Sequence, residues 1–342
     1  MEVLIMNNKN SCSFQYLIQS FFQQRLMQHK KVSGQTINSY RDTFKIYFEF
    51  LIGEYNIQPS AITLEHLDRE HILEFCKYLE TRRKNCSSTI NNRLSAIHSF
   101  LKYVSEMSPD NSYLVSQSLA IPFQKTTIKT MDFITKDEFD SIILLCDTNT
   151  MLGARDKLMF LILYNTGLRV SELISLKYCD INDLDIPNRT CLKIYGKGRK
   201  ERIVPLWKTT SQYLSKYIDR FGIKDNDYLL IGKNGEKLTR SGVRFRVEKY
   251  VKEAGNTCNS LKNKNISVHT FRHSVAMNLL QAGVDISTIA IWLGHSSILT
   301  THKYMVADIE LKRKAMERVN TSSDSTMNYQ PSDDILEFLK NL

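Results

Sequence analysis

The chain has 342 residues, of which 42% are hydrophobic, and its formal net charge at pH 7 is +10. This length supports a packed core and favours two domains, and the charge suits a polyanionic partner. No stretch approaches the roughly 20 apolar residues that cross a bilayer, and the N-terminus lacks the apolar run of a signal peptide. The seven cysteines form no CxxC pair, which is typical of reduced thiols, so we expect a cytoplasmic protein.

Four segments of the first 108 residues carry apolar residues at helical spacing, which predicts a small helical bundle. The first contains Phe14 and Phe21, and the second runs from about Thr36 to Ile52. The third begins after Asp68, a residue type that caps helix N-termini well. The fourth begins near Ser87. We therefore predict an N-terminal helical domain over residues 1–108.

The helical pattern fails between residues 109 and 130, where prolines and polar residues predict an interdomain linker. The second predicted domain covers residues 131–319. The remaining residues, 320–342, begin with a polar tether and end in a short amphipathic segment, residues 333–342. A helix that short needs a surface to pack on.

The second domain opens with a capping box, Thr135 to Glu138, and continues with an apolar helix that we place at its centre and end at Gly167. The only good strand signal, Cys191 to Leu206, predicts a β-hairpin with a basic tip. Helices are predicted again at 240–254, 271–282 and 285–293. The fold class is therefore mainly α, with a helical bundle followed by an α-rich domain that carries a small β-hairpin.

Six residues of the second domain suit one kind of chemistry. Arginine forks pair bidentately with anionic oxygens, a lysine can deliver a proton, and a tyrosine hydroxyl can attack a phosphate covalently. Because the tyrosine pKa is near 10, that attack needs an electropositive pocket. The candidates, in chain order, are Arg169, Lys197, His269, Arg272, His295 and Tyr304.

The motifs around these residues resemble those of the tyrosine recombinase family, the integrases of the lambda and Xer type. The resemblance covers nearly the whole chain and implies a SAM-like core-binding domain before a catalytic domain with the tyrosine recombinase fold. It rests on five segments in order, Gly167-Leu168-Arg169, Gly196-Lys197-Gly198, His269-Thr270-Phe271-Arg272, Leu293-Gly294-His295 and Thr300 to Tyr304.

The resemblance implies site-specific DNA recombination without a cofactor or metal. Tyr304 would form a 3′-phosphotyrosyl link, and Lys197 would protonate the leaving 5′-oxygen. Arg169, Arg272 and His295 would hold the phosphate, and His269 would assist proton movement. Glu172 follows Arg169 by three residues and is expected to support it. The family acts as a tetramer through a Holliday junction, so we expect synapsed DNA, a homotetramer and a nucleoid association. An accessory or partner recombinase is also possible, and residues 333–342 are expected to dock on a neighbouring protomer.

Other interpretations remain open. Four histidines invite a metal site, but the chain has neither an HExxH pair nor cysteines in ligand spacing. The basic hairpin tip lacks P-loop spacing. A relaxing topoisomerase would share the nucleophile, and a DNA-binding regulator would share only the fold. Within recombination, the chain could serve a mobile element, which we favour for its C-terminal extension, or Xer-like dimer resolution.

Further DNA contacts are predicted at the starts of three helices and at the hairpin tip. Small polar side chains at helix starts suit phosphates, and a basic helix can enter a major groove. The first two groups lie in the N-terminal domain and the last two in the catalytic domain: Thr36, Asn38, Tyr40 and Arg41; Ser87, Ser88, Thr89, Asn91, Asn92 and Arg93; Arg199 and Lys200; and Arg240, Ser241 and Arg244.

Overall fold

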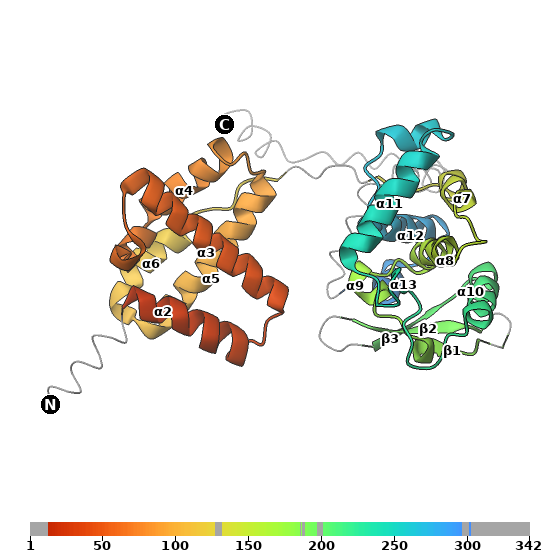
Figure 1. Cartoon of the computed structure of the whole chain (residues 1–342). Coiled ribbons are helices and arrows are strands. Elements are labelled where there is room, and N and C mark those ends of the chain that lie inside the picture. The colour runs from red at the N-terminus through yellow and green to blue at the C-terminus, as the bar shows by residue number, and fades with distance from the viewer. Residues whose placement is uncertain are drawn as a thin grey trace, which may run out of the picture. The chain divides into compact units, whose positions relative to one another are not determined.

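The computed structural model describes residues 13–126, 132–184, 186, 189–196, 201–295 and 301. Contacts divide the chain into two compact units, Met1–Ile128 and Lys129–Leu342, each with its own hydrophobic core. Figure 1 labels the elements of both units. None of the helices described is long and apolar enough to cross a membrane.

The N-terminal unit is a helical bundle around an aromatic core. Phe100 lies edge-on to Phe14, Phe21 and Phe44, with ring centroids 6.0, 5.3 and 5.3 Å away, an arrangement that aromatic quadrupoles favour. The bundle's elements are α2 (Phe14–Ser20), a π-helical segment (Phe21–His29), α3 (Gly34–Tyr55), α4 (Arg69–Thr81), α5 (Ser87–Met107) and α6 (Ser112–Leu119), with 3₁₀ turns at Pro59–Ala61, Leu64–Leu67 and Pro109–Asn111.

The predicted bundle is confirmed, including the cap at Asp68, whose side chain accepts a hydrogen bond from the backbone N–H of His71. The predicted linker over residues 109–130 differs from what we observe at its start. Pro109 opens a 3₁₀ turn, where a missing N–H costs nothing, and α6 follows. Val115 is buried in the core, and Ser118 Oγ donates to the carbonyl of Leu67, so α6 belongs to the bundle.

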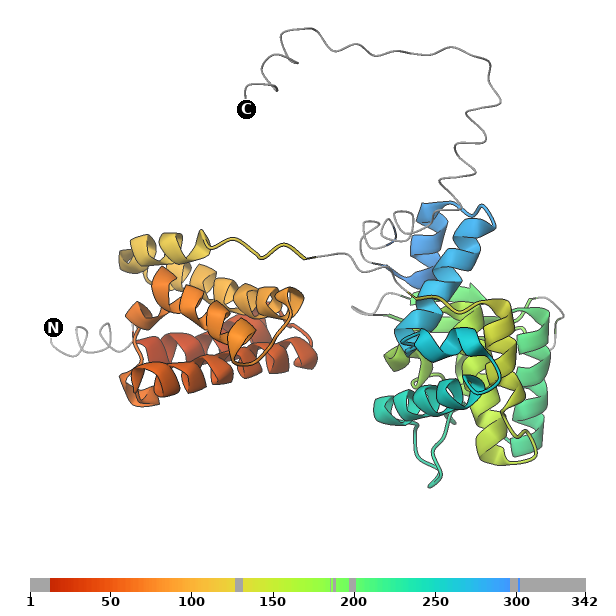
Figure 2. The same ribbon diagram turned by 90° about the horizontal axis from the view of Figure 1, so that it is seen from above.

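The second unit is built around α8 (Met151–Thr166), the predicted central helix. Helix α8 is buried on nearly every face and lies between α10 and α12 (Figure 1). Figure 2 shows the same packing from above. The other helices are α7 (Lys136–Leu144), α9 (Val170–Leu173), α10 (Lys208–Phe221), α11 (Arg240–Ala254), α12 (Val268–Gln281) and α13 (Ile286–Leu293), with 3₁₀ turns at Tyr178–Asp180 and Asn259–Asn263.

The predicted hairpin is present as β2 (Cys191–Tyr195) and β3 (Glu201–Pro205), which pair antiparallel with Ile194 opposite Arg202. A third strand, β1 (Ile181–Asn182), pairs with β2 and was not predicted, since two residues give no periodicity. Helix α10 was also missed. Its apolar stripe, which includes Leu214, Tyr217 and Ile218 at helical spacing, was present in the sequence.

Helix α8 ends as predicted at Gly167, which adopts the left-handed conformation with φ of 64°. A Cβ at this position would lie 2.9 Å from Leu293 Cδ2 and 3.3 Å from Val275 Cβ. Gly167 therefore satisfies two requirements at once, a positive φ and the close approach of α12 and α13 to the end of α8.

Gly222 ends α10 with φ of 62°, but nothing lies within 4 Å of the Cβ it would carry. We expect Gly222→Ala to lower the free energy of unfolding by about 1 kcal/mol, the cost of a left-handed L-residue. Gly167→Ala should cost about 1–3 kcal/mol more, because overpacking adds to that strain. Urea unfolding of both variants measures the difference. Equal losses of unfolding free energy would show that α12 and α13 move apart at little cost to accommodate a Cβ at Gly167.

Candidate active site

Four of the six predicted catalytic residues are described, and they meet at one place although they come from separate elements. Arg169 is the N-cap of α9, and His269 and Arg272 lie on the first turns of α12. His295 follows α13, two residues past its end. Lys197 and Tyr304 lie outside the described residues, as do Arg199, Lys200 and the C-terminal segment 333–342.

Three arginines hold three consecutive carbonyls at the end of α13. Arg202 Nε donates to the carbonyl of Trp292 at 3.0 Å, and Arg272 Nη2 donates to that of Leu293 at 2.6 Å. Arg169 Nη2 donates to the carbonyl of Gly294 at 2.9 Å. The last carbonyls of a helix have no partner within it and carry the negative end of its dipole, so cations stabilise them. His295 is thereby fixed beside three positive charges.

Arg272 also ties this helix end to α8. Its side chain is 2% exposed, and its Nη1 donates to the carbonyl of Gly167 at 2.9 Å. Gly167 and Leu293 are both helix termini, so one guanidinium joins the ends of two helices. A charge this deeply buried requires such partners.

The buried carboxylate of Glu172 lies between two guanidinium groups. Its Oε1 accepts from Arg169 Nη1 at 2.9 Å and from Arg202 Nη1 at 3.1 Å. Its Oε2 accepts from Arg202 Nη2 at 2.8 Å and from the backbone N–H of Arg169 at 2.9 Å. The i,i+3 contact with Arg169 is the one that the sequence predicts. Burial raises the pKa of Glu172, but these hydrogen bonds outweigh it and lower that pKa overall.

The two histidines of the site have lowered pKa values. Burial lowers the pKa of His295 to about 4, and the charges of Arg272 and Arg169 act in the same direction. Burial and the same two arginines lower the pKa of His269. Burial and the neighbouring arginines therefore both favour the neutral form of these two rings. His295 Nδ1 is also 2.8 Å from Thr301 Oγ1, a contact that orients the ring.

Sequence reasoning missed Arg202 and Thr301 as members of this site. Arg202 had a signal, since it lies two residues before Val204 on β3 and therefore points to the same face of the strand. Val204 is fully buried and the Arg202 side chain is 9% exposed. An arginine on the buried face of a strand requires an acceptor. Thr301 carried no comparable signal.

In the N-terminal unit, the starts of α3 and α5 meet and line an open hollow of about 340 Å³. Among its lining residues are four that the sequence predicts, Asn38, Thr89, Asn92 and Arg93, together with Gln35 and Asp42. The Nε of Arg93 is buried without a hydrogen-bond partner in the described part of the chain. The hollow thus gathers amide, carboxylate and guanidinium groups at one surface.

Two predicted DNA-contact residues of this unit also make contacts within the protein. The ring of Tyr40 stacks on Phe21, with centroids 6.3 Å apart, and packs against the core. The side-chain amide of Asn91 exchanges two hydrogen bonds with the backbone of Gln124, both at 2.9 Å. Both residues remain partly exposed, so their contact with DNA stays a prediction.

The other predicted polar residues of this unit lie at or near the surface. Thr36 Oγ1 is 2.9 Å from Ser33 Oγ in the N-cap of α3. Arg41 pairs with Asp42 at 3.0 Å, with both side chains more than half exposed. Ser88 and Thr89 hydroxyls each lie 3.3 Å from Cys86 Sγ at the start of α5, and Ser87 is partly buried there.

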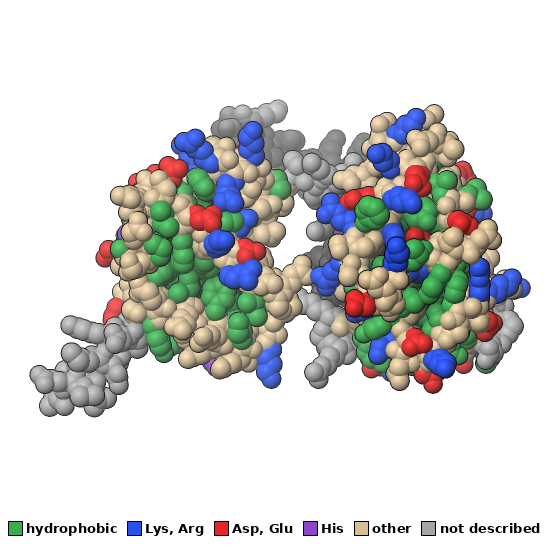
Figure 3. Space-filling view, viewed as in Figure 1, with side chains coloured by type: hydrophobic (Ala, Val, Ile, Leu, Met, Phe, Trp, Pro, Cys, Tyr) green, Lys and Arg blue, Asp and Glu red, His purple; other side chains and the backbone are tan. Residues whose placement is uncertain are grey.

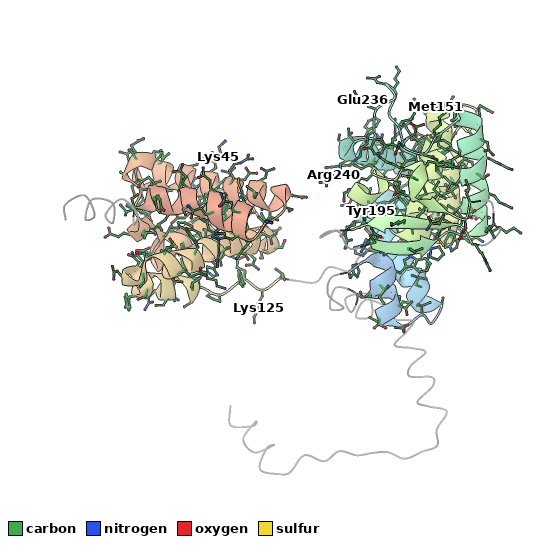
Figure 4. All side chains as sticks on the ribbon, turned by 90° about the horizontal axis from the view of Figure 1, so that it is seen from below. Lys45, Lys125, Met151, Tyr195, Glu236 and Arg240 are labelled. Carbon is green, nitrogen blue, oxygen red and sulfur yellow. The ribbon has the colours of Figure 1, made fainter. Side chains whose placement is uncertain are left out.

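Helix α11 presents the other predicted DNA-contact residues. Figure 3 shows lysine and arginine side chains over this helix, and Figure 4 shows Arg240 and Tyr195 at the same edge of the unit. Ser241 is exposed, and Arg244 is 80% exposed while pairing with Glu248 at 2.6 Å. By contrast, Arg246 pairs with the buried Asp156, which anchors the opposite face of α11 to α8.

No group of three or more histidine, cysteine or acidic side chains that could hold a metal ion occurs among the residues described.

Comparisons with known proteins identify the class. The model of the phage integrase family matches residues 132–310, and that of the phage integrase N-terminal SAM-like domain matches residues 18–106. The chain therefore belongs to the phage integrase family and is a tyrosine recombinase.

Individual relatives cover almost the whole chain. A putative integrase/recombinase y4rC of Sinorhizobium fredii is 37% identical over 95% of this chain and 97% of its own. Tyrosine recombinase XerD of Oceanobacillus iheyensis is 34% identical over 85% of this chain and 93% of its own.

Solved structures share the fold. XerH recombinase bound to a palindromic difH substrate, in a post-cleavage complex, has a TM-score of 0.67 at 23% identity and covers 82% of this chain and 78% of its own. The Tn1549 transposon integrase in complex with transposon right-end DNA has a TM-score of 0.66 at 16% identity and covers 88% of this chain and 98% of its own.

The lowered pKa of His295 gives a test of the site's electrostatics. In the native state the ring should stay neutral until the pH falls toward 4, whereas in the unfolded chain it protonates near 6.5. This contribution to stability is therefore full above pH 6.5 and is lost as the pH falls toward 4. Histidine NMR titration should place the pKa well below 6.5, and Arg169→Gln should raise it by removing a positive neighbour. An unshifted pKa in both proteins would contradict the clustering of charge.

Proposed function

We propose that this chain is a site-specific DNA recombinase that cleaves and rejoins strands through a 3′-phosphotyrosyl intermediate and a Holliday junction. The observation that carries the proposal is the meeting of Arg169, Arg272, His269 and His295 around the end of α13. An electropositive pocket of this kind suits an oxyanion that gains charge as it reacts. Polyanionic DNA is the partner that the net charge of +10 favours.

In this mechanism Tyr304 attacks the scissile phosphorus in line, and the bond to the 5′-oxygen breaks. Arg169 and Arg272 stabilise the nonbridging oxygens, and neutral His295 donates a hydrogen bond to one of them. Lys197 gives its proton to the leaving 5′-oxygen, and His269 assists proton movement. The phosphotyrosyl bond retains the energy of the broken ester, so rejoining needs neither nucleotide nor divalent metal.

The hollow between α3 and α5 is proposed to read bases. Arginine pairs with guanine, asparagine and glutamine pair with adenine, and a carboxylate accepts from cytosine. Arg93, Asn38, Asn92 and Gln35 supply the first two kinds of group, and Asp42 supplies the third. The acid would repel phosphates, so this hollow suits base edges better than the backbone. Exposed residues at the starts of α3, α5 and α11, together with Arg199 and Lys200, then contact the flanking phosphates.

We further propose that four copies act on two DNA sites, for a mobile genetic element. The full-length similarity to a putative integrase/recombinase supports this role, and the similarity to XerD keeps dimer resolution as the alternative. A relaxing topoisomerase is distinguished by its products. Incubation with two-site DNA gives recombinants if sites are exchanged, and only relaxed circles if they are not.

The direct test of the proposed chemistry uses a nicked suicide substrate, which traps the covalent intermediate. Wild-type protein and a Tyr329→Phe control should form a protein–DNA adduct that survives denaturation. Tyr304→Phe should bind the same DNA with unchanged affinity and form none, because only one hydroxyl is removed. An adduct with Tyr304→Phe would assign the nucleophile elsewhere, and no adduct with wild type on any candidate site would refute strand cleavage.

The base-reading hollow has its own test. We expect Arg93→Gln to weaken binding to the recombination site by about 10-fold or more, the range of one lost bidentate base contact of about 1–3 kcal/mol. Lys102→Gln removes the same charge from the exposed far end of α5 and should change affinity little. Binding to unrelated DNA should be nearly equal for the two variants. Equal losses on the specific site would show that Arg93 acts by charge alone.

A further inference from the structure

We propose that Arg202 is a positioning residue for strand cleavage, which holds the Glu172 carboxylate so that Arg169 keeps donors for the phosphate. The inference rests on the proposed function. Arg202 contributes all three of its donor nitrogens to fixed acceptors, the two oxygens of Glu172 and the carbonyl of Trp292. Its side chain is 9% exposed, too enclosed to contact DNA directly.

The carboxylate of Glu172 accepts hydrogen bonds from two guanidinium groups, which bind it with different geometries. Arg202 approaches it end-on with Nη1 and Nη2, the bidentate geometry that carboxylates favour. Arg169 is left with a single side-chain contact, Nη1 to Oε1, and its Nη2 is directed to the carbonyl of Gly294. The Arg169 side chain remains 34% exposed, so part of its fork still faces the site.

Without Arg202, the carboxylate of Glu172 would have one guanidinium left to pair with, that of the partly exposed Arg169. A fork-to-fork pair with Arg169 would then form, because a buried charge that loses a partner is strongly destabilised. That pair would draw both terminal nitrogens of Arg169 toward Glu172, away from Gly294 and from the phosphate. Arg202 therefore prevents a competing ion pair inside the site.

Arg202 also sets the path of the chain that carries His295. A Cβ on Gly294 would lie 2.8 Å from Arg202 Nη1 and 3.0 Å from its Cζ, so the guanidinium packs directly on this glycine. Gly294 has φ of 66°, which glycine adopts without strain. Strand β3 is thus connected to the end of α13 by both a hydrogen bond and a close contact.

The fork geometry distinguishes arginine from lysine at this position. The three acceptors of Arg202 lie on two separate elements, α9 and α13, and one planar group reaches them all. A lysine ammonium is a point charge that cannot repeat this pattern. Charge and geometry can therefore be tested separately.

The experiment measures single-turnover cleavage of the suicide substrate at saturating DNA, together with DNA affinity and thermal unfolding. Arg202→Met should bind the site within about threefold of wild type but cleave on the order of 100-fold more slowly, as expected for a misplaced catalytic group. Lys193→Met is the matched control. It removes a cation of the same hairpin that pairs with the exposed Glu201 and lies over the ring of Tyr195, and it should cleave at the wild-type rate.

The decisive variant is Glu172→Gln/Arg202→Met. Removing the carboxylate removes the competing pair, so this protein should cleave about 10-fold faster than Arg202→Met. A purely structural role predicts the opposite, a further loss. Arg202→Lys keeps the positive charge but not the fork geometry, so its cleavage should remain slow. This variant replaces Arg202→Met in the test if Arg202→Met does not fold.

Wild-type cleavage by Arg202→Lys, or a double variant no faster than Arg202→Met, would overturn the inference. Absence of cleavage by the wild-type protein would instead refute the proposed function, and the wild-type measurement alone reveals that outcome.

Discussion

The capping of α13 by three arginines is the interaction on which the catalytic unit depends. Trp292, Leu293 and Gly294 present carbonyls with no partner within the helix, and Arg202, Arg272 and Arg169 each take one. The arginines come from β3, α12 and the start of α9, so a helix end of three residues joins elements that are distant in sequence. Each contact alone is an ordinary charge-assisted hydrogen bond. Together they fix where His295 lies and concentrate positive charge around it.

The same arrangement explains how a concentration of cations is tolerated in a folded protein. Like charges at short range repel, and buried ones lack hydration. Here backbone carbonyls and the carboxylate of Glu172 accept from the guanidinium groups, while burial, with the charges of Arg272 and Arg169, lowers the pKa of both histidines. The described side chains that bond to this helix end or to one another include three guanidinium groups and the carboxylate of Glu172, so positive charge is concentrated there. An incoming phosphate would relieve that repulsion, so the site is prepared for an anion before it arrives.

Much of this architecture could be predicted from sequence because the relevant signals are local. The capping box at Thr135, the left-handed end at Gly167 and the hairpin from Cys191 each follow from a few neighbouring residues, and each is present. The linker prediction failed at α6 because its amphipathic pattern is short and follows Pro109. Tyr40 and Asn91 contact Phe21 and Gln124, which lie 19 and 33 residues away, and no local pattern encodes such partners.

Arg202 shows both what local sequence patterns predict and what depends on residues distant in the sequence. Strand alternation with Val204 places it on the buried face, which already requires a counter-charge. Strand alternation does not identify the counter-charge as Glu172, thirty residues earlier. It also does not predict that the guanidinium of Arg202 binds the end of α13. Gly294 of the Leu293-Gly294-His295 motif is likewise explained by one local and one distant cause. It is required by its positive φ and also by a guanidinium 2.8 Å from where a Cβ would be, so the hairpin and the histidine motif constrain each other's sequence. Motifs that look independent along the chain are therefore parts of one electrostatic unit.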